Sequence, residues 1–172
     1  MIFKIKGEAM YPKKKFDVTT KYSAFSYATF LLSKREYSVY KISSKLKEKG
    51  YESNDIVEAI DRLQELKYLD DNRFCDAFIR SKKNGNGWGE SRIRLELKMK
   101  HGVDENIINE LMPEYDFEKE KLKRYIKKFG KTTPVDNKDY QKRARFLVSK
   151  GFSFKLPSIE EMESFEEEHG IS

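Results

Sequence analysis

Apolar residues recur at helical spacing from residue 24 onward, and glycines interrupt the pattern at intervals. The first stretch places Ala24, Ala28 and Leu31 on one face of a helix. A second helix carries Ile42 and ends at Gly50, because glycine tolerates the left-handed conformation after a helix C-terminus. The apolar face of a third helix then consists of Ile56, Val57, Ile60 and Leu63.

The same order of elements begins again after residue 69. A helix with Phe74 and Phe78 on one side precedes a glycine-rich joint at residues 84–89. The next helix is expected over residues 88–101, and Gly102 ends it. A short helix from residue 104 onward completes this second round, with its apolar face at Ile107, Ile108 and Leu111.

A third round follows, and it is less regular. Its first helix ends at Gly130 and has a stripe formed by Leu122, Tyr125, Ile126 and Phe129. Its second helix ends at Gly151, and the positions expected to face inward are Tyr140, Ala144, Leu147 and Val148. A last, acidic helix is expected from residue 158 to about residue 168. The expected N-caps are Ser53, Asp136 and either Asp70 or Asp71.

The repetition is the main signal for the fold. Gly50, Gly102 and Gly151 occupy the same place in each round and lie 52 and 49 residues apart. A helix followed by glycine and an apolar residue is also a common motif that could recur by chance. We predict an all-α fold of three tandem three-helix repeats that form an elongated rod. The expected divisions are a basic N-terminal arm at 1–23, repeats at 24–69, 70–115 and 116–157, and an acidic helix or tail at 158–172.

Composition agrees with an elongated array. Only 38% of the residues are hydrophobic and 37% are charged, which suits repeats with little interior and much surface. The single cysteine, Cys75, excludes an intramolecular disulfide and fits a reducing compartment. No apolar run approaches the ~18 residues of a membrane helix, and the N-terminus lacks the apolar core of a signal peptide. We therefore expect a cytoplasmic protein that does not enter a membrane.

The basic surplus points to polyanionic partners. The net charge is +6, the surplus lies in the arm and body, and residues 153–172 carry six Glu and one Lys. Dense cations of this kind neutralise phosphates, although they also solubilise a thin helical array, and neighbouring Glu residues offset many of them. The candidate DNA- or protein-binding cations are Lys82, Lys83, Arg92, Arg94, Lys98, Lys100, Lys127, Lys128, Arg143 and Arg145.

The helix at 88–101 has two apolar stripes, which is unusual for a surface helix. Ile93 and Leu97 lie on one face, and Trp88, Leu95 and Met99 lie on nearly the opposite face. The second stripe is either buried between neighbouring repeats or open to a partner, and burial is the favoured interpretation for a central repeat. Trp88, Leu95 and Met99 are the candidate partner contacts.

Motifs for catalysis, cofactor binding and metal binding are absent from the sequence. Neither His101 nor His169 has Cys, Asp or Glu neighbours at metal-ligand spacing. Cys75 has no nearby histidine in sequence and is most simply a small core residue. The glycine-rich segment at 84–89 lacks the Gly-Lys-Ser/Thr ending of a phosphate loop. We expect a binding protein without a cofactor, not an enzyme.

Six short segments occur in a characteristic order along the chain: 28–32 (ATFLL), 34–38 (KREYS), 45–51 (KLKEKGY), 69–74 (LDDNRF), 89–97 (GESRIRLEL) and 150–153 (KGFS). Together they resemble the RecX family of bacterial proteins that regulate the RecA recombinase. The resemblance covers most of residues 24–152. The spacing between Leu97 and Gly102 is one residue longer than the family's, and Phe154 to Pro157 interrupts the place where the last helix would begin.

The resemblance implies both an architecture and a partner. It implies three tandem three-helix repeats in a curved rod, which binds along the helical groove of the RecA–DNA filament. It further implies inhibition or modulation of the recombinase, ATPase and coprotease functions of RecA in DNA repair and the SOS response. Weak, sequence-independent binding to single- or double-stranded DNA, a monomeric state and no catalysis complete the expectation.

Two other functions remain open at this point. Three-helix units resemble helix-turn-helix modules, so a stand-alone DNA-binding protein is the first alternative. Against it, no helix begins with the mixture of Arg, Asn and Gln that reads base edges. The second alternative is a structural adaptor for a different protein, with the stripe of Trp88, Leu95 and Met99 as its contact.

Overall fold

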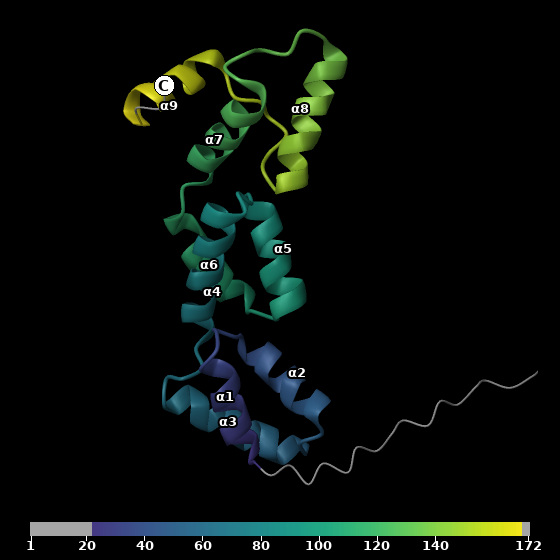
Figure 1. Cartoon of the computed structure of the whole chain (residues 1–172), viewed down its shortest axis with the longest axis vertical. Coiled ribbons are helices and arrows are strands. Elements are labelled where there is room, and N and C mark those ends of the chain that lie inside the picture. The colour runs from purple at the N-terminus through teal and green to yellow at the C-terminus, as the bar shows by residue number, and fades with distance from the viewer. Residues whose placement is uncertain (1–21, 170–172) are drawn as a thin grey trace, which may run out of the picture.

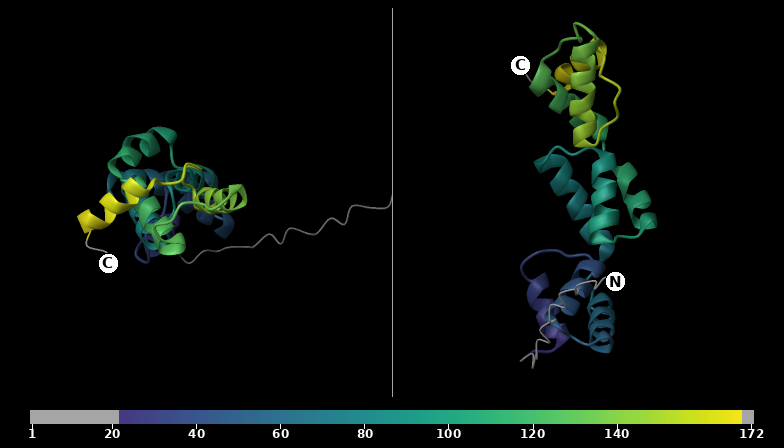
Figure 2. Two further views of the ribbon diagram at one scale, coloured as in Figure 1. Left: turned by 90° about the horizontal axis from the view of Figure 1, so that it is seen from above. Right: turned by 90° about the vertical axis from the view of Figure 1, so that its right-hand side faces the viewer.

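The computed structural model describes residues 22–169, and these residues form α-helices joined by turns, with no β-strand among them. The basic arm predicted for residues 1–23 lies almost wholly outside the described part of the chain. The helices form three groups of three, stacked one after another along a single long axis (Figures 1 and 2). The predicted all-α fold of three tandem three-helix repeats in an elongated rod is confirmed.

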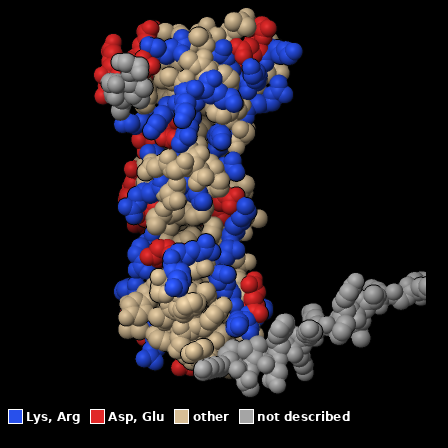
Figure 3. All heavy atoms as spheres, viewed as in Figure 1, with Lys and Arg blue, Asp and Glu red and all other residues tan. Residues whose placement is uncertain are grey.

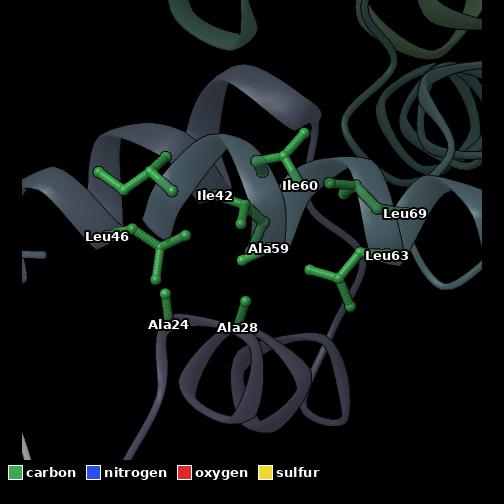
Figure 4. Packing of buried hydrophobic residues seen from close by; sticks show 9 residues of the cluster. Ala24, Ala28, Ile42, Leu46, Ala59, Ile60, Leu63 and Leu69 are labelled. Carbon is green, nitrogen blue, oxygen red and sulfur yellow. The ribbon is translucent and has the colours of Figure 1, made fainter. Parts of the chain in front are cut away.

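The first repeat consists of α1 (Ala24–Leu32), α2 (Val39–Lys49) and α3 (Ser53–Glu65). Its core is made where all three helices meet, and Figure 4 shows Ala24 and Ala28 of α1 facing the larger side chains of α2 and α3. The small side chains on α1 let its backbone approach the other two helices closely. The predicted N-cap at Ser53 is wrong by one residue: Glu52 holds that position, without a side-chain hydrogen bond.

The second repeat consists of α4 (Asp71–Arg80), α5 (Glu90–His101) and α6 (Glu105–Leu111). Of the two predicted caps, Asp70 is the N-cap of α4, where its carboxylate accepts from two backbone N–H groups. The joint expected at residues 84–89 is shorter than predicted. A π-helical turn, η1 (Ser81–Gly85), continues α4, so only the segment between Gly85 and Glu90 separates the two helices. A 3₁₀ turn, η2 (Met112–Glu114), follows α6.

The third repeat consists of α7 (Phe117–Phe129), α8 (Asn137–Lys150) and α9 (Ile159–His169). Asp136 caps α8 as predicted, with its carboxylate accepting from the N–H of Asp139. The helix α9 packs into this repeat through Met162 and Phe165, which are 1% and 6% exposed. The segment that the sequence gives as an acidic helix or tail therefore contains a helix, as expected, and this helix is the third one of the last repeat.

The inward face of α8 differs from the one predicted. Leu147 is fully buried as expected, but Tyr140 and Val148 are 40% and 54% exposed. The inward position between them is taken by Arg143, which is 7% exposed. The buried face of α8 thus differs from the face that the apolar pattern predicts, because Arg143, a polar residue, occupies an inward position.

Within residues 22–169, no helix combines the length and the hydropathy that a membrane span requires.

Candidate binding surface

The first and second repeats meet where α2 begins and α5 ends, and we call this contact the first junction. The hydroxyl of Ser38, the N-cap of α2, donates to the carbonyl oxygen of His101 at 2.6 Å. The N–H of Val39 donates to Oδ1 of Asp71 at 2.8 Å. Gly102, the left-handed residue after α5, lies so close to the Tyr40 ring that an added Cβ would stand 2.6 Å from it. A residue of the second repeat therefore completes the N-terminal end of α2, and a residue of the first repeat completes the C-terminal end of α5.

An ion pair reinforces this junction at its edge. The guanidinium of Arg73 contacts both carboxylate oxygens of Glu36, at 3.0 and 3.3 Å. The same guanidinium donates to the carbonyl oxygens of Lys67 and Tyr68 at the end of the first repeat. A bidentate pair with further backbone acceptors is geometrically specific, so Arg73 fixes the angle between the two repeats.

The second and third repeats meet in the same way, where α5 begins and α8 ends. At this second junction the N–H of Gly89 donates to the carbonyl oxygen of Lys150 at 2.8 Å. The N–H of Ser91 donates to the carbonyl oxygen of Gly151 at 3.1 Å. The guanidinium of Arg92 donates to the carbonyl oxygen of Ser149 at 3.1 Å. Two of the orphan N–H groups at the start of α5 are therefore satisfied by two orphan carbonyls at the end of α8.

The two junctions join the second helix of each repeat into one row along the rod, which we call the second-helix column (α2, α5 and α8). These helices follow one another along the right-hand side of Figure 1. At each junction the C-terminal end of one helix meets the N-terminal end of the next. This contact is electrostatically favourable because the helix dipole places partial negative charge at the first end and partial positive charge at the second.

Charge is divided between the second and third helices of the repeats. In α2, α5 and α8, Lys and Arg outnumber Asp and Glu by four to one, four to two and five to one. In α3, α6 and α9 the balance is reversed, with one base against four acids, none against two and none against six. Figure 3 shows Lys and Arg distributed along the length of the visible face, with smaller groups of Asp and Glu among them, one of which lies around α9. The second helices are thus more basic than the third helices of the same repeats, and in the third repeat α7 is as basic as α8, with six bases against two acids.

Three of the candidate cations on α5 are already neutralised by acids of their own repeat. Nε of Arg94 lies 2.7 Å from Glu90, and its guanidinium also donates to Asn109. Nζ of Lys98 lies 2.6 Å from Glu105, and Nζ of Lys100 lies 2.8 Å from Glu96. Exposed pairs of this kind contribute little stability, but they reduce the charge that a phosphate would meet.

The other candidate cations differ in their surroundings. Lys82 lies over the rings of Phe78 and Trp88, and Arg92 lies 4.1 Å from the centre of the Trp88 ring. Nζ of Lys128 lies 4.9 Å from the centre of the Phe146 ring. No acid within residues 22–169 pairs with any of these cations, nor with Lys83, Lys127 and Arg145.

Arg143 is not a surface cation, and its expected role in DNA binding is corrected. Its guanidinium is held by the carboxylate of Asp139 at 2.7 Å, by the hydroxyl of Tyr125 at 3.0 Å and by the carbonyl oxygen of Thr132 at 2.6 Å. These groups enclose it within the third repeat, so it stabilises the contact between α7, α8 and the turn that joins them.

The second apolar stripe of α5 is open, contrary to the favoured interpretation. Leu95 and Met99 are 62% and 68% exposed, whereas Ile93 and Leu97 are fully buried. Trp88 does not belong to this exposed surface, because it is half-buried and packs against the core of the second repeat. The exposed part of the stripe lies in the middle of the second-helix column, between the two junctions.

The described residues contain neither a group of metal ligands nor a reactive cysteine. Cys75 is fully buried, and burial raises the pKa of its thiol to about 11. His101 packs against Phe74 and Phe78, and burial, assisted by the charge of Lys41, lowers its pKa.

Three further cations were not singled out by sequence. Arg35, Lys41 and Lys45 line a cleft at the first junction together with Lys82 of the second repeat. Arg35 and Lys45 approach the same ring, that of Tyr37. Lys41 and Lys45 stand four residues apart on one face of α2, a spacing that can be seen in the sequence. The cleft itself forms only because α4 lies opposite them, which the sequence does not show.

Comparison with protein families gives three matches in chain order. Residues 24–63 match the first three-helix domain of RecX, residues 70–112 match the second and residues 122–156 match the third. The matches follow the three repeats of the structure. The helix α9 lies beyond the third match.

Curated relatives and solved structures agree with this result. The chain is 41% identical to the regulatory protein RecX of Vibrio parahaemolyticus over 141 residues, covering 80% of this chain and 88% of the relative. It is 37% identical to that of Legionella pneumophila over 134 residues, covering 75% and 86%. The crystal structure of RecX from Lactobacillus salivarius superposes with a TM-score of 0.65 at 21% identity, over 84% of this chain and 93% of that one.

Proposed function

The chain belongs to the RecX family of regulatory proteins, and from this premise we propose that it binds the RecA–DNA filament and modulates RecA. In this proposal the rod lies along the helical groove of the filament and inhibits or tunes the recombinase, ATPase and coprotease activities of RecA. The protein acts by occupying this groove. It does so as a cytoplasmic monomer and performs no catalysis itself. DNA contributes weak contacts that do not depend on sequence.

The observation that supports this proposal best is the second-helix column. It is basic, it runs the length of the rod, and it carries two exposed apolar side chains, Leu95 and Met99, at its middle. A partner that repeats along a helical axis would meet equivalent helices of successive repeats. Several weak contacts then add within one molecule, because after the first contact the others form at high effective concentration.

The division of charge argues against the stand-alone helix-turn-helix alternative. In a helix-turn-helix module the helix after the turn enters the major groove beside the phosphates. Here the third helix of each repeat, α3, α6 or α9, carries an excess of acid and would be repelled by phosphates. The N-terminal ends of α2 and α5 are covered at the junctions.

The direct test is ATP hydrolysis by RecA of the same organism on single-stranded DNA. We expect the full-length protein to suppress hydrolysis at substoichiometric amounts, because one rod spans contacts on neighbouring subunits. Unchanged hydrolysis and strand exchange with excess protein would contradict the proposal. Removal of residues 158–172 is not a clean variant, because it takes Met162 and Phe165 out of the third core. Substitution of exposed Glu residues on α9 by Gln tests the acidic helix without this damage.

A further inference from the structure

A cleft of about 530 Å³ opens beside the first junction, between α2 and α4. One wall comes from the first repeat and carries Tyr37, Lys41 and Lys45. The opposite wall comes from α4 and η1 and carries Phe78 and Lys82. The cleft has the size of a small-ligand site, which is typically ~300–1,000 Å³. It exists only because two repeats are joined at this angle.

The cations of this cleft rest on aromatic rings. The guanidinium of Arg35 lies 4.5 Å from the centre of the Tyr37 ring, and Nζ of Lys45 lies 5.7 Å from it. Nζ of Lys82 lies 5.3 Å from the centre of the Phe78 ring and 5.2 Å from that of Trp88. A ring face attracts a cation through its quadrupole and leaves the full positive charge available to an anion.

This arrangement is the opposite of that on α5. There Arg94, Lys98 and Lys100 each pair with a carboxylate of the same repeat. The cleft contains two acids, and one of them, Glu36, is already paired with Arg73. Four cations thus face one unpaired carboxylate, that of Glu48, among the described residues of the cleft.

Lysines on both walls of the cleft act electrostatically on the same residue, His101. Lys41 of α2 and Lys82 of η1 both disfavour the protonated form of His101, in addition to burial, which is the main cause of its lowered pKa. Both walls therefore place positive charge near His101, which lines the same cleft.

We propose that the first-junction cleft binds the phosphate backbone of a single-stranded nucleic acid. Three of its four cations are lysines, which bind phosphate as point charges. Tyr37 and Phe78 are half-buried and line the same cleft, so the parts of their rings that the cations leave open can contact bases, an aromatic contact that binding sites for single strands combine with cations. These features favour a nucleic acid strand over an acidic peptide.

The inference rests in part on the proposed function, because it gives a location and a strand preference to the weak DNA contact suggested there. Its test uses no RecA. If the parent protein suppresses RecA but binds no single strand, only the cleft proposal is overturned, whereas strand binding by the parent protein without any effect on RecA would overturn only the filament proposal.

The experiment compares two double variants that lower the net charge by the same amount. Lys41→Gln with Lys45→Gln removes cations from the cleft, and Lys98→Gln with Lys100→Gln removes cations that are paired with Glu. Binding of a fluorescein-labelled oligodeoxythymidine is measured by anisotropy over a series of salt concentrations. Circular dichroism checks that each variant keeps its helix content. If the Lys41→Gln/Lys45→Gln variant loses helix content, Lys82→Gln on the opposite wall takes its place.

We expect the cleft variant to bind about tenfold more weakly at low salt, and to reduce the slope of log affinity against log salt by roughly 1.4, since each single-strand phosphate contact contributes about 0.7. The α5 variant should bind within about twofold of the parent protein, since its cations are neutralised. Equal losses in both variants, or none in either, would overturn the proposal. So would equal binding of a duplex, or competition by polyglutamate as effective as that by the unlabelled oligonucleotide.

Discussion

The backbone N–H of Gly89 donates to the carbonyl oxygen of Lys150 at 2.8 Å, so that α5 begins on the last turn of α8. The first junction repeats this relationship with Ser38 and His101, 63 residues apart in the chain. In both cases the end of one helix supplies the acceptor for the start of another. The rod is therefore held together by helix termini, and its rigidity depends on a few backbone groups and the glycines beside them.

Replacement of Gly151 by Ala should weaken the second junction. Gly151 has φ 92° and ψ 18°, and an added Cβ would stand 2.4 Å from Cβ of Arg92. Gly50 has nearly the same dihedral angles, φ 96° and ψ 17°, but is exposed at the end of α2. Gly50→Ala therefore measures the backbone strain alone, about 1–2 kcal/mol.

We expect Gly151→Ala to lower the urea midpoint further than Gly50→Ala does, because the new methyl group also forces α5 and α8 apart. It should also increase backbone hydrogen exchange at Gly89 and Ser91, whose N–H groups lose their acceptors. Equal destabilisation by the two substitutions would show that the close approach at Gly151 does not hold the repeats together.

Arg143→Met should destabilise the third repeat by about 2 kcal/mol, the scale of hydrogen bonds to a charged group. The substitution leaves the hydroxyl of Tyr125 and the carbonyl oxygen of Thr132 without their charged donor. Arg145→Met is the matched control, because Arg145 is exposed and its Nε donates only to a backbone oxygen of its own helix. Chemical denaturation that ranks the two variants equally would contradict a structural role for Arg143.

Much of the fold could be predicted from local signals. Gly50, Gly102 and Gly151 end the second helices in the left-handed conformation, and Asp70 and Asp136 cap the helices that follow them. These are interactions between near neighbours in sequence, and they can be read without knowing the tertiary structure. Ser53 was misplaced because a serine can equally well occupy the first turn of a helix.

The segments on which the family resemblance rests acquire a physical meaning in the structure. Glu36 and Ser38 of segment 34–38 contact Arg73 and His101, and Gly89 and Gly151 meet at the second junction. These short motifs therefore encode contacts between repeats as well as core positions such as Leu46 and Leu97. Sequence alone indicated that they belonged together but could not show what they touch.

The candidate site was less predictable, because its properties depend on side chains that are distant in sequence. Arg143 has the charge of a surface cation, and only the packing of Tyr125 and Thr132 from α7 and the following turn shows that it is internal. Lys98 pairs with Glu105 across the turn after α5, which helical spacing does not reveal. The exposure of Leu95 depends on what the neighbouring repeats leave uncovered.

Acidification should destabilise the first junction through His101. Burial, with the charges of Lys41, Lys82 and Lys100 opposed by that of Glu96, lowers the pKa of His101 in the folded chain from its ordinary value of 6.5. The folded state therefore favours the neutral imidazole. The resulting stabilisation is complete above pH 6.5, and it is lost as the pH falls from there through the lowered folded pKa.

His101→Phe should remove this part of the pH dependence. Nδ1 of His101 is buried and has no hydrogen-bond partner among the described residues, so its removal sacrifices no hydrogen bond. Above pH 6.5 the thermal midpoints of the parent protein and the variant should change with pH in parallel. Below pH 6.5 the midpoint of the parent protein should fall more steeply than that of the variant. Parallel curves between pH 5 and 8 would show that His101 does not titrate on unfolding.

Cys75 should be inert in the folded protein. Its side chain is fully buried and its pKa is raised to about 11, so almost no thiolate exists at pH 8. Reaction with a thiol-specific disulfide reagent should be slow in buffer and rapid in urea. Rapid reaction under native conditions would show that the core of the second repeat opens readily.

The central claim, that the second-helix column is the surface that meets RecA, is tested most directly by co-sedimentation with RecA filaments formed on single-stranded DNA. The measurement compares the parent protein with Leu95→Glu/Met99→Glu, which places two charges on the column, and with Val57→Glu on α3, which is 59% exposed away from it. We predict that the parent protein and Val57→Glu sediment with the filament equally, and that the double variant requires at least about tenfold more protein, equivalent to 1.4 kcal/mol. Equal sedimentation of all three proteins would contradict the account.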